Sequence, residues 1–398
     1  MTEFEAAIAD ADVAVGADAF VEDGAGLEVA VVGGGAVGVT AAYDLATRGA
    51  SVTLYERDSI ASGASGRAAG ICYNAFAGTL DGEIARESIE RFRRLSGDDT
   101  FPFTECPYVW LARTGDDRGA NAIESAVSTM QERGVVAVTM DGAALGERFP
   151  AMYTDDVEIA GVAGAAGYTD PTRYTACLGA AASGAGATLE TATAVSVRGD
   201  PPRVVPDESG QEREFDAVLV AAGAQSGSLL ADAGYPIAVK PYRVQAATAT
   251  GTLEEPTCYD ATGSFYVRPH PTGLLAGNGT ELTEADSADW DRTSSPGFAS
   301  DLLDRVARRF PGAAPSVERS WAGLCTATPD RDPLVGAVAD GLYVATGFQG
   351  EGFMRAPAIG ERFATEIVGG EGIDPFDPTR FDGEESFEIR EGIAVEEL

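Results

Sequence analysis

The sequence is poor in residues that several classes of functional site require. It has one lysine among its 28 basic residues, Lys240, and one histidine, His270. A single histidine excludes a histidine-rich metal site and a Ser-His-Asp triad built elsewhere in the chain. The five cysteines are odd in number and form no CxxC pair, so they indicate neither a disulfide framework nor a zinc site. We therefore expect no metal, and the cysteine usage indicates the cytoplasm.

Long apolar runs are scarce as well. No run approaches the roughly 20 residues that a membrane-spanning helix needs, and the acidic N-terminus lacks the basic start of a signal peptide. These two features predict a soluble intracellular protein.

Positive charge is the third shortage, since the net charge is −35. In addition, every basic residue except Lys240 is arginine. A surface this acidic and poor in lysine is typical of a halophilic protein from a high-salt cytoplasm. An acidic patch that recruits a basic partner is the alternative, although the acids are spread along the whole chain. Either way, the charge disfavours binding to nucleic acid or to an anionic membrane.

The strongest motif lies in residues 27–58, where an apolar run, a glycine-rich turn, a small-residue helix pattern and a second apolar run follow one another. Three glycines share the turn and the start of the helix: Gly33, Gly35 and Gly38. The first permits a tight turn, the second lets backbone approach a pyrophosphate, and the third lets the helix pack on the sheet. Glu56 ends the second run, where an acid holds ribose hydroxyls. The motif predicts a Rossmann-like site for NAD or FAD.

The next segment, residues 59–76, is rich in glycine and serine and contains Arg67. Loops of this length are usually functional or disordered. Its small residues and single arginine suit backbone that wraps around a second phosphate or ribose, and a flexible surface loop is the alternative.

Further along the chain, hydrophobic periodicity and capping residues predict a series of elements. The predicted helices cover residues 81–95, 123–134, 171–184 (after an Asp170 cap) and 302–310, and a further helix follows GFQGEG with Ile359, Phe363 and Ile367 four residues apart. The predicted strands cover 108–113, 242–250, 264–268 and 342–345. Three further strands, 191–198, 203–206 and 214–220, are expected to form a small antiparallel meander. The last strand, 342–345, is followed by the glycine-rich turn GFQGEG and then by a helix. As in the first motif, this order places a helix N-terminus where it can bind an electron-rich group.

Taken in order, these motifs resemble the D-amino-acid oxidase (DAO) superfamily of FAD-dependent oxidoreductases. The resemblance spans roughly residues 28 to 369. It rests on VGGGAVG with YERD, SGASGRAAG, GYTDP at 167–171, VAAGAQS at 220–226, FYVRPHPTG at 265–273, WAGLCTATPDRDPLVG at 321–336 and GFQGEGFMRAPAIGE at 347–361. The pattern is most similar to the glycine and sarcosine oxidase and the dimethylglycine and proline dehydrogenase branch, and this resemblance selects FAD over NAD.

The resemblance implies a discontinuous domain organisation in an α/β (α+β) fold. A Rossmann-like FAD-binding domain is expected to comprise 27–105, 150–235 and 320–370. An inserted antiparallel-sheet substrate domain is expected to comprise 106–149 and 236–319. Acidic tails are expected at 1–26 and 371–398.

Carried over by position, the resemblance also implies a cofactor site. The implied FAD-binding residues are Gly33, Gly35, Ala36, Val37, Gly38, Glu56, Arg57, Ser62, Ser65, Gly66, Arg67, Ala69, Gly70, Val195, Ala222, Gly223, Gly347, Gly350, Gly352, Phe353 and Met354. FAD is expected to be noncovalent, because the flavin-tethering cysteine of monomeric sarcosine oxidase aligns with Gly323.

The implied reaction is oxidation of the C–N bond of a small amino acid or secondary amine by hydride transfer to flavin N5, which gives an imine that water hydrolyses. Several residues depart from the relatives: Cys325 replaces a carboxylate-binding arginine of glycine oxidase, and Glu351 and Met354 replace a histidine and a lysine of monomeric sarcosine oxidase. A carboxylate clamp would have to come from Arg355, Arg268, Arg243 or Arg67. Tyr266 and Tyr242 are either pocket walls or ordinary sheet residues.

Two other functions stay open at this point. One is oxidation of a 2-hydroxy acid or glycerol phosphate on the same fold, and the other is a flavin-bound assembly subunit without turnover. The electron acceptor is undetermined, and the position of Lys240 outside the flavin motifs favours a dehydrogenase over an oxidase. A homo-oligomer or a partner subunit is compatible with the sequence.

Overall fold

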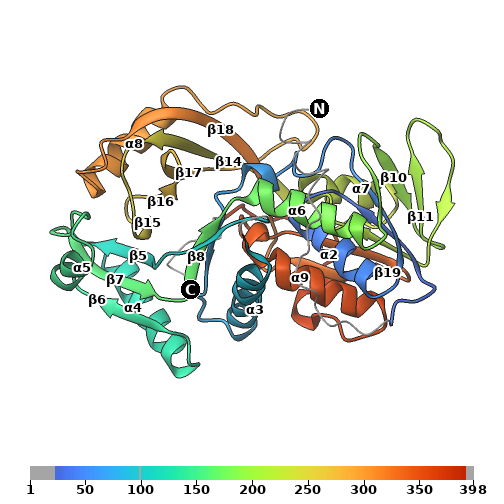
Figure 1. Ribbon diagram of the computed structural model, residues 1–398, viewed down its shortest axis with the longest axis horizontal. Coiled ribbons are helices and arrows are strands. Elements are labelled where there is room, and N and C mark those ends of the chain that lie inside the picture. The colour runs from blue at the N-terminus through green and yellow to red at the C-terminus, as the bar shows by residue number, and fades with distance from the viewer. Residues whose placement is uncertain (1–22, 98–99, 391–398) are drawn as a thin grey trace.

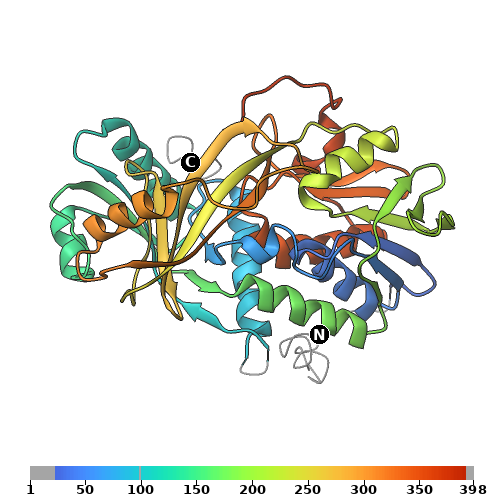
Figure 2. The same ribbon diagram turned by 90° about the horizontal axis from the view of Figure 1, so that it is seen from above.

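A computed structural model of the chain describes residues 23–97 and 100–390. Two large sheets dominate it and lie in opposite halves of the molecule (Figure 1). One half carries a mostly parallel sheet with helices packed on it, and the other carries a mostly antiparallel sheet (Figure 2).

The six-stranded sheet is the nucleotide-binding half. Its strand order is β19 (Leu334–Ala339), β20 (Leu342–Thr346), β13 (Ala217–Val220), β1 (Glu28–Val32), β2 (Ser51–Tyr55) and β9 (Thr188–Glu190). All pairs are parallel except β19 with β20. The helices α2 (Ala36–Thr47), α6 (Pro171–Gly184) and α9 (Gly352–Ile367) lie next to one another in this half (Figure 1). Because β1, β2, β13 and β20 run in the same direction, their carboxyl ends meet at one edge of the sheet.

The eight-stranded sheet builds the other half. Its order is β18 (Ser316–Ala327), β14 (Lys240–Thr250), β17 (Gly273–Glu284), β16 (Phe265–His270), β15 (Thr257–Asp260), β5 (Tyr108–Arg113), β7 (Val157–Ala163) and β6 (Ala137–Met140). Only β15 and β5 pair in parallel. The helices α4 (Asp117–Glu132), α5 (Gly142–Arg148) and α8 (Phe298–Arg309) accompany this sheet.

Two three-stranded sheets complete the fold. One contains β3 (Ile71–Tyr73), β8 (Ala166–Thr169) and β4 (Phe103–Glu105), and the other contains β10 (Val195–Arg198), β11 (Arg203–Pro206) and β12 (Arg213–Glu214). The helices α3 (Thr79–Leu95) and α7 (Ser226–Asp232) lie in the connections.

Local signals predicted most elements well. The predicted strand 108–113 is β5 without any shift, and α3 ends at Leu95 as expected. Asp170 caps α6, because its side chain accepts hydrogen bonds from the backbone N–H groups of Thr172 and Arg173.

The predicted meander was partly wrong. We expected 214–220 to be one strand of it, but this segment divides between two sheets. Arg213 and Glu214 form β12 and close the meander, whereas β13 pairs in parallel with β1 and β20. The four residues of β13, AVLV, are all buried, which is typical of a central parallel strand covered on both faces. The first predicted strand is also shorter and begins at Val195.

The domain boundaries stay a prediction. The eight-stranded sheet takes strands from 108–163 and 240–327, so it includes β7 and all of β18, most of which we assigned to the FAD-binding domain. Residues 1–22 of the expected N-terminal tail and 391–398 of the expected C-terminal tail lie outside the described residues.

The described part of the C-terminal segment, residues 371–390, differs from an acidic tail because it packs on the fold. Phe376 and Ile389 are buried, and Ile389 contacts the buried cluster that contains Tyr242 and Ala327. The Lys240 ammonium donates to the carbonyl oxygen of Phe387 at 2.7 Å and lies over the Phe387 ring.

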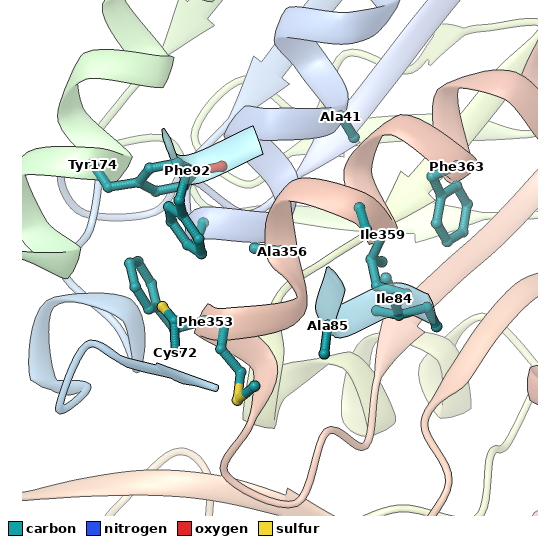
Figure 3. Close-up of a cluster of buried hydrophobic side chains, with 14 of the residues drawn as sticks. Ala41, Cys72, Ile84, Ala85, Phe92, Tyr174, Phe353, Ala356, Ile359 and Phe363 are labelled. Carbon is teal, nitrogen blue, oxygen red and sulfur yellow. The ribbon is translucent and has the colours of Figure 1, made fainter. Parts of the chain in front are cut away.

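A buried core joins α2, α3 and α9 (Figure 3). Ile359 and Phe363 on α9 lie near Ile84 of α3, and Phe353 packs against Phe92 with ring centroids 5.4 Å apart. Since Phe353 stands in the first turn of α9, this core fixes where that helix begins.

Candidate functional site

A cavity of about 800 Å³ lies between the two halves. Its walls include the ends of β1, β2 and β13, the loop after β2, residues of β14 and β18 in the eight-stranded sheet and the turn that precedes α9. The carboxyl edge of the parallel sheet therefore opens into it, as in other open α/β sheets that bind ligands at this edge.

The glycine turn after β1 forms one end of the cavity. Gly33 has a φ of +117°, and a Cβ on it would lie 2.4 Å from the carbonyl oxygen of Ala221, so only glycine fits where β1 and β13 end together. Gly33, Gly35, Ala36 and Val37 line the cavity. The N-terminus of α2 therefore faces the space where a pyrophosphate would lie.

Gly38 lets α2 pack closely, as the glycine spacing predicted, although the family resemblance also implied it as a cofactor residue. It does not line the cavity; a Cβ on it would lie 2.0 Å from the carbonyl oxygen of Gly33. Its small size lets α2 pack against the turn, so it supports the cavity wall from behind.

Glu56 is fixed at the end of β2. One carboxylate oxygen accepts from the backbone N–H of Gly34 at 2.8 Å, and the other accepts from the backbone N–H of Asp58 at 2.9 Å. The carboxylate lines the cavity beside the glycine turn, at the position from which an acid reaches a ribose.

The loop 59–76 forms a second wall of the cavity. Ser65 Oγ accepts from the backbone N–H of Ala36 at 2.8 Å, which ties the loop to the N-terminus of α2. Arg67 lines the cavity, donates to the carbonyls of Ser62 and Gly63, and lies over the ring of Trp290. The loop therefore folds onto the cavity, which favours a binding role over a free surface loop.

Most of the implied cofactor residues surround this one cavity. Those that line it are Gly33, Gly35, Ala36, Val37, Glu56, Arg57, Ser62, Ser65, Arg67, Ala69, Gly70, Val195, Ala222, Gly223, Gly350, Gly352, Phe353 and Met354. Gly66 and Gly347, like Gly38, do not line it. A Cβ on Gly66 would meet the carbonyl oxygen of Ala61 at 2.2 Å, and one on Gly347 would meet Thr328 Cγ2 at 2.5 Å, so both shape turns behind the wall.

The other end of the cavity is formed by the turn before α9. Gly347, Gln349 and Gly350 all have positive φ values, of +79°, +51° and +90°. Gly350 and Gly352 line the cavity, so the N-terminus of α9 opens onto it. A second helix terminus with a favourable field for negative charge thus faces the same space as α2.

Gln349 carries an unsatisfied group at this turn. It lines the cavity and is 4% exposed, and neither Nε2 nor Oε1 of its side chain has a hydrogen-bond partner in the described residues. An unsatisfied buried amide costs about 1–3 kcal/mol. A bound polar group at this end of the cavity would supply the partner.

Of the three expected substrate-pocket residues, only Tyr266 lines the cavity. The Arg355 guanidinium bonds to the carboxylates of Glu351 and Asp81 and lies over the Phe76 ring. Arg268 donates to the carbonyl of Ala69 from behind the wall, and burial lowers its pKa to about 10. The structure therefore does not bring these two arginines to the cavity.

Of the other two arginines considered for a carboxylate clamp, Arg67 lines the cavity and Arg243 does not. Arg243 does not line the cavity and bonds to Glu281 and to the carbonyls of Asp291 and Thr293. Arg67 lines it together with Arg292, a residue that the sequence analysis missed. Burial first, and then the charges of Arg292 and Arg319, lower the pKa of Arg67, so these arginines form one cationic group. Arg292 lies in an irregular loop between β17 and α8, where no pattern marked it.

Two further wall residues were missed, and they contact each other. Tyr73 Oη donates to Glu351 Oε1 at 2.8 Å, and both residues line the cavity. The Tyr73 ring stacks on Tyr108, another wall residue, with centroids 4.2 Å apart and planes 10° apart. Burial, and then the Glu351 charge, raise the pKa of Tyr73 well above its usual value, so its hydroxyl stays protonated as a donor. The acid within the GFQGEG motif was the only sequence signal for this pair.

These features define a class of protein. A parallel sheet whose glycine turn and helix N-terminus open onto a large cavity, with an acid at the end of the second strand, is the arrangement of a dinucleotide-dependent enzyme. Residues 28–366 match the DAO family, described as FAD dependent oxidoreductase, and the chain belongs to this family. FAD is therefore the dinucleotide that the cavity serves.

Individual relatives support the same assignment. The chain is 27% identical over 360 residues to a glycine oxidase of Geobacillus kaustophilus, a match that covers 84% of this chain and 90% of that protein. It is 28% identical to 4-methylaminobutanoate oxidase (formaldehyde-forming) of Paenarthrobacter nicotinovorans, covering 89% of this chain and 46% of that protein.

Solved structures share the fold. L-proline dehydrogenase from P. horikoshii superposes with a TM-score of 0.80 at 26% identity, covering 89% of this chain and 98% of that chain. Glycine oxidase from Geobacillus kaustophilus superposes with a TM-score of 0.79 at 25% identity, covering 89% of this chain and 99% of that one. No helix within the described residues combines the length and apolar character that crossing a membrane requires.

Proposed function

We propose that the protein oxidises the C–N bond of a small amine or amino acid and passes the hydride to FAD. The observation that carries this proposal is the single cavity that extends from the Gly33 turn to the N-terminus of α9. One end matches the adenosine half of a dinucleotide, and the other presents tyrosines, Glu351 and a helix terminus to a reacting group. The named relatives, a glycine oxidase and a 4-methylaminobutanoate oxidase, support this substrate class.

The wall residues would divide the work of holding FAD. The Gly33 turn and the α2 N-terminus would bind the pyrophosphate, with Ser65 fixing the loop beside it. Glu56 would hold the adenosine ribose, and Val195 would contact the adenine. Gly350, Gly352, Phe353 and Met354 would lie at the isoalloxazine, where the α9 N-terminus favours negative charge.

FAD, when bound, supplies the hydride acceptor at N5 of its ring. The chain's own residues have three other tasks: to hold the substrate carbon near that atom, to exclude water and to keep the amine unprotonated. The buried tyrosines Tyr73, Tyr108 and Tyr242 suit the second task, because they line the cavity and are each less than one-tenth exposed. Water then hydrolyses the imine product after it leaves the dry part of the site.

We further propose noncovalent FAD and a dehydrogenase. Gly323 stands at the tethering position of monomeric sarcosine oxidase and cannot form a thioether. Lys240 is the chain's single lysine, does not line the cavity and is bonded to Phe387. It is therefore not placed to help oxygen accept electrons. Acid precipitation should release the yellow cofactor into the supernatant, and peroxide formed rapidly in air without an added dye would contradict the dehydrogenase proposal.

The substrate class can be tested by anaerobic reduction of the bound flavin in high-salt buffer. A panel of sarcosine, proline, glycine, D-amino acids, simple secondary amines, 2-hydroxy acids and glycerol phosphate is mixed with the oxidised holoenzyme, and loss of flavin absorbance is followed. Bleaching by amines or amino acids is the expected result. Bleaching by hydroxy acids alone would replace the proposal, and no bleaching by any member would favour a subunit without turnover.

A soluble cytoplasmic location and the absence of a nucleic-acid partner remain expectations from the sequence. Association into a homo-oligomer or with a partner subunit is likewise a proposal, which size-exclusion chromatography with light scattering in high salt can test.

A further inference from the structure

The end of the cavity near α9 carries charged side chains whose formal charges sum to a negative value. Glu351 is 8% exposed and lines the cavity. Its Oε2 pairs with Arg355, and the same guanidinium pairs with Asp81. Two carboxylates share one guanidinium, so this cluster of Glu351, Arg355 and Asp81 has a formal charge of −1.

Glu351 retains acceptor capacity after its hydrogen bonds to the described residues are counted. Each oxygen of an ionised carboxylate has two lone-pair sites. Oε1 accepts one hydrogen bond from Tyr73, and Oε2 accepts one from Arg355. One further donor can therefore bind to each oxygen. The stacking of Tyr73 between Tyr108 and Phe76 fixes the ring, which holds the carboxylate in one orientation.

The cavity arginines belong to a different group of residues. Arg67 lies over Trp290, packs near Gly323, and has its pKa influenced by Arg292, Arg319 and Asp58. The acidic cluster is built by other residues, since Glu351 bonds to Tyr73 and Arg355, and Arg355 bonds to Asp81.

An independent feature on the same turn points to a polar ligand at this end. Gln349, two residues before Glu351, has a buried amide without a hydrogen-bond partner in the described part of the chain. A ligand with both an N–H donor and an acceptor would satisfy groups that the protein alone leaves open.

We propose that Glu351, oriented by Tyr73, binds the ammonium group of the substrate and accepts its proton, so that the substrate is a cationic amine that needs no carboxylate beside the reacting carbon. This inference rests on the proposed amine oxidation. An N–H bond of the ammonium breaks and an O–H bond forms on Glu351. The neutral amine has the nitrogen lone pair that can form the C=N bond, and FAD, when bound, would supply the hydride acceptor.

The same charge disfavours α-amino acids. Arg355, the arginine nearest to Glu351 in sequence, is already held by two carboxylates and does not line the cavity. A substrate carboxylate placed next to the amine would therefore approach a cluster of like charge, which is unfavourable.

The test uses two probes that share a tert-butyl group and carry opposite charges, tert-butylammonium and pivalate. Neither has a hydrogen on the carbon that bears its charged group, so neither can donate a hydride from that carbon. Each is titrated into the oxidised holoenzyme at constant ionic strength, and binding is followed by the change in the flavin spectrum. We expect tert-butylammonium to bind more tightly than pivalate. Glu351→Gln should weaken its binding roughly 10- to 100-fold, the range of one charge-assisted hydrogen bond.

Two variants complete the design. Glu132→Gln makes the same change of charge on an exposed residue of α4 and should leave the binding unaltered. Tyr73→Phe keeps the stacked ring and the Arg355 pair but removes the hydroxyl, so it should weaken tert-butylammonium binding several-fold even if Glu351→Gln does not retain FAD. Pivalate binding as tightly as tert-butylammonium, or binding of the cation that is unchanged in both site variants, would overturn the proposal. Failure of the amine oxidation itself would appear differently, as no bleaching of the wild-type flavin by any amine.

Discussion

The buried ion pair between Arg91 and Asp44 gives the sharpest prediction about what holds the cavity in shape. Arg91 of α3 is 1% exposed and Asp44 of α2 is fully buried. Arg91 Nη1 donates to Asp44 Oδ2 at 2.7 Å and to the carbonyl oxygen of Pro357 at 2.7 Å. Because Pro357 lies inside α9, one guanidinium ties together the two helices whose N-termini open onto the cavity.

Asp44→Asn keeps the shape of the side chain but removes its charge. The amide that replaces the carboxylate keeps one acceptor oxygen for Arg91 but gives up the negative charge, while the Pro357 carbonyl and a carboxylate oxygen of Glu361 at 3.7 Å stay beside the guanidinium. Breaking a buried pair from one side costs about 3–5 kcal/mol, since it leaves a buried charge uncompensated. With an unfolding entropy of about 2.1 cal/mol/K per residue, a chain of this size has roughly 0.8 kcal/mol/K in total. The variant should therefore lower the melting temperature by roughly 4–6 °C.

Differential scanning fluorimetry of the holoenzyme in high salt measures this shift, and the flavin released on mild dilution reports the cavity. Asp44→Leu combined with Arg91→Met replaces both charges and should recover most of the lost stability, because an apolar pair needs no compensation. A melting temperature within 1 °C of wild type for Asp44→Asn would refute the argument, because it would show that Arg91 does not depend on this partner.

Four further changes test other parts of the site. Gly38→Ala places a Cβ 2.0 Å from the Gly33 carbonyl oxygen and should purify with little flavin, whereas Gly63→Ala, a wall glycine with nothing within 4 Å of its Cβ, should keep a full complement. Arg268→Met removes the donor to the Ala69 carbonyl and should raise the Kd for FAD by roughly 10-fold or more, measured by fluorescence titration. Lys240→Met breaks its bond to Phe387 and should cost about 1 kcal/mol of stability while leaving dye reduction unchanged; loss of dye reduction would place the lysine in the reaction. For Asp330, burial favours the neutral carboxyl, but the hydrogen bonds and charge of Arg380 outweigh it and lower the pKa below 3.8. The pair thus stabilises the fold above the unfolded pKa and loses this contribution as the pH falls through the folded pKa, so Asp330→Asn should flatten the acid side of a melting-temperature profile against pH.

Local chemistry explains what the sequence could predict about the fold. The Gly33 turn, the Asp170 cap and the strand β5 are each specified by a few adjacent residues. The pairing of β13 with β1 and β20 depends on strands that lie more than 100 residues away in either direction. No residue pattern within 214–220 predicts pairing with β1 and β20. The segment was therefore assigned to the neighbouring meander.

The same distinction holds for the site. Most of the cofactor residues that the family resemblance implied line the cavity, and its glycine turns are recognisable because a close approach of backbone demands glycine whatever the ligand. The sequence could not predict which of the four candidate clamp arginines reaches the cavity. Arg355 turns toward Asp81, which is 274 residues away, and so leaves the cavity wall to others. Arg268 has the Ala69 carbonyl as its partner, 199 residues away. Such distant partners decide where a long side chain points. The residue type alone therefore does not predict its direction.

Glu351 shows how one residue can account for several departures from the relatives. Its contact with Tyr73 joins positions 278 residues apart, so no local pattern marked the pair. The family resemblance implies cationic side chains in relatives at the positions of Cys325 and Met354. Both of these residues line the same cavity as Glu351. A cationic side chain on that wall would pair with the Glu351 carboxylate and would compete with an ammonium ligand for it. Under the proposed function, the uncharged residues at 325 and 354 would therefore leave this carboxylate available to a substrate amine.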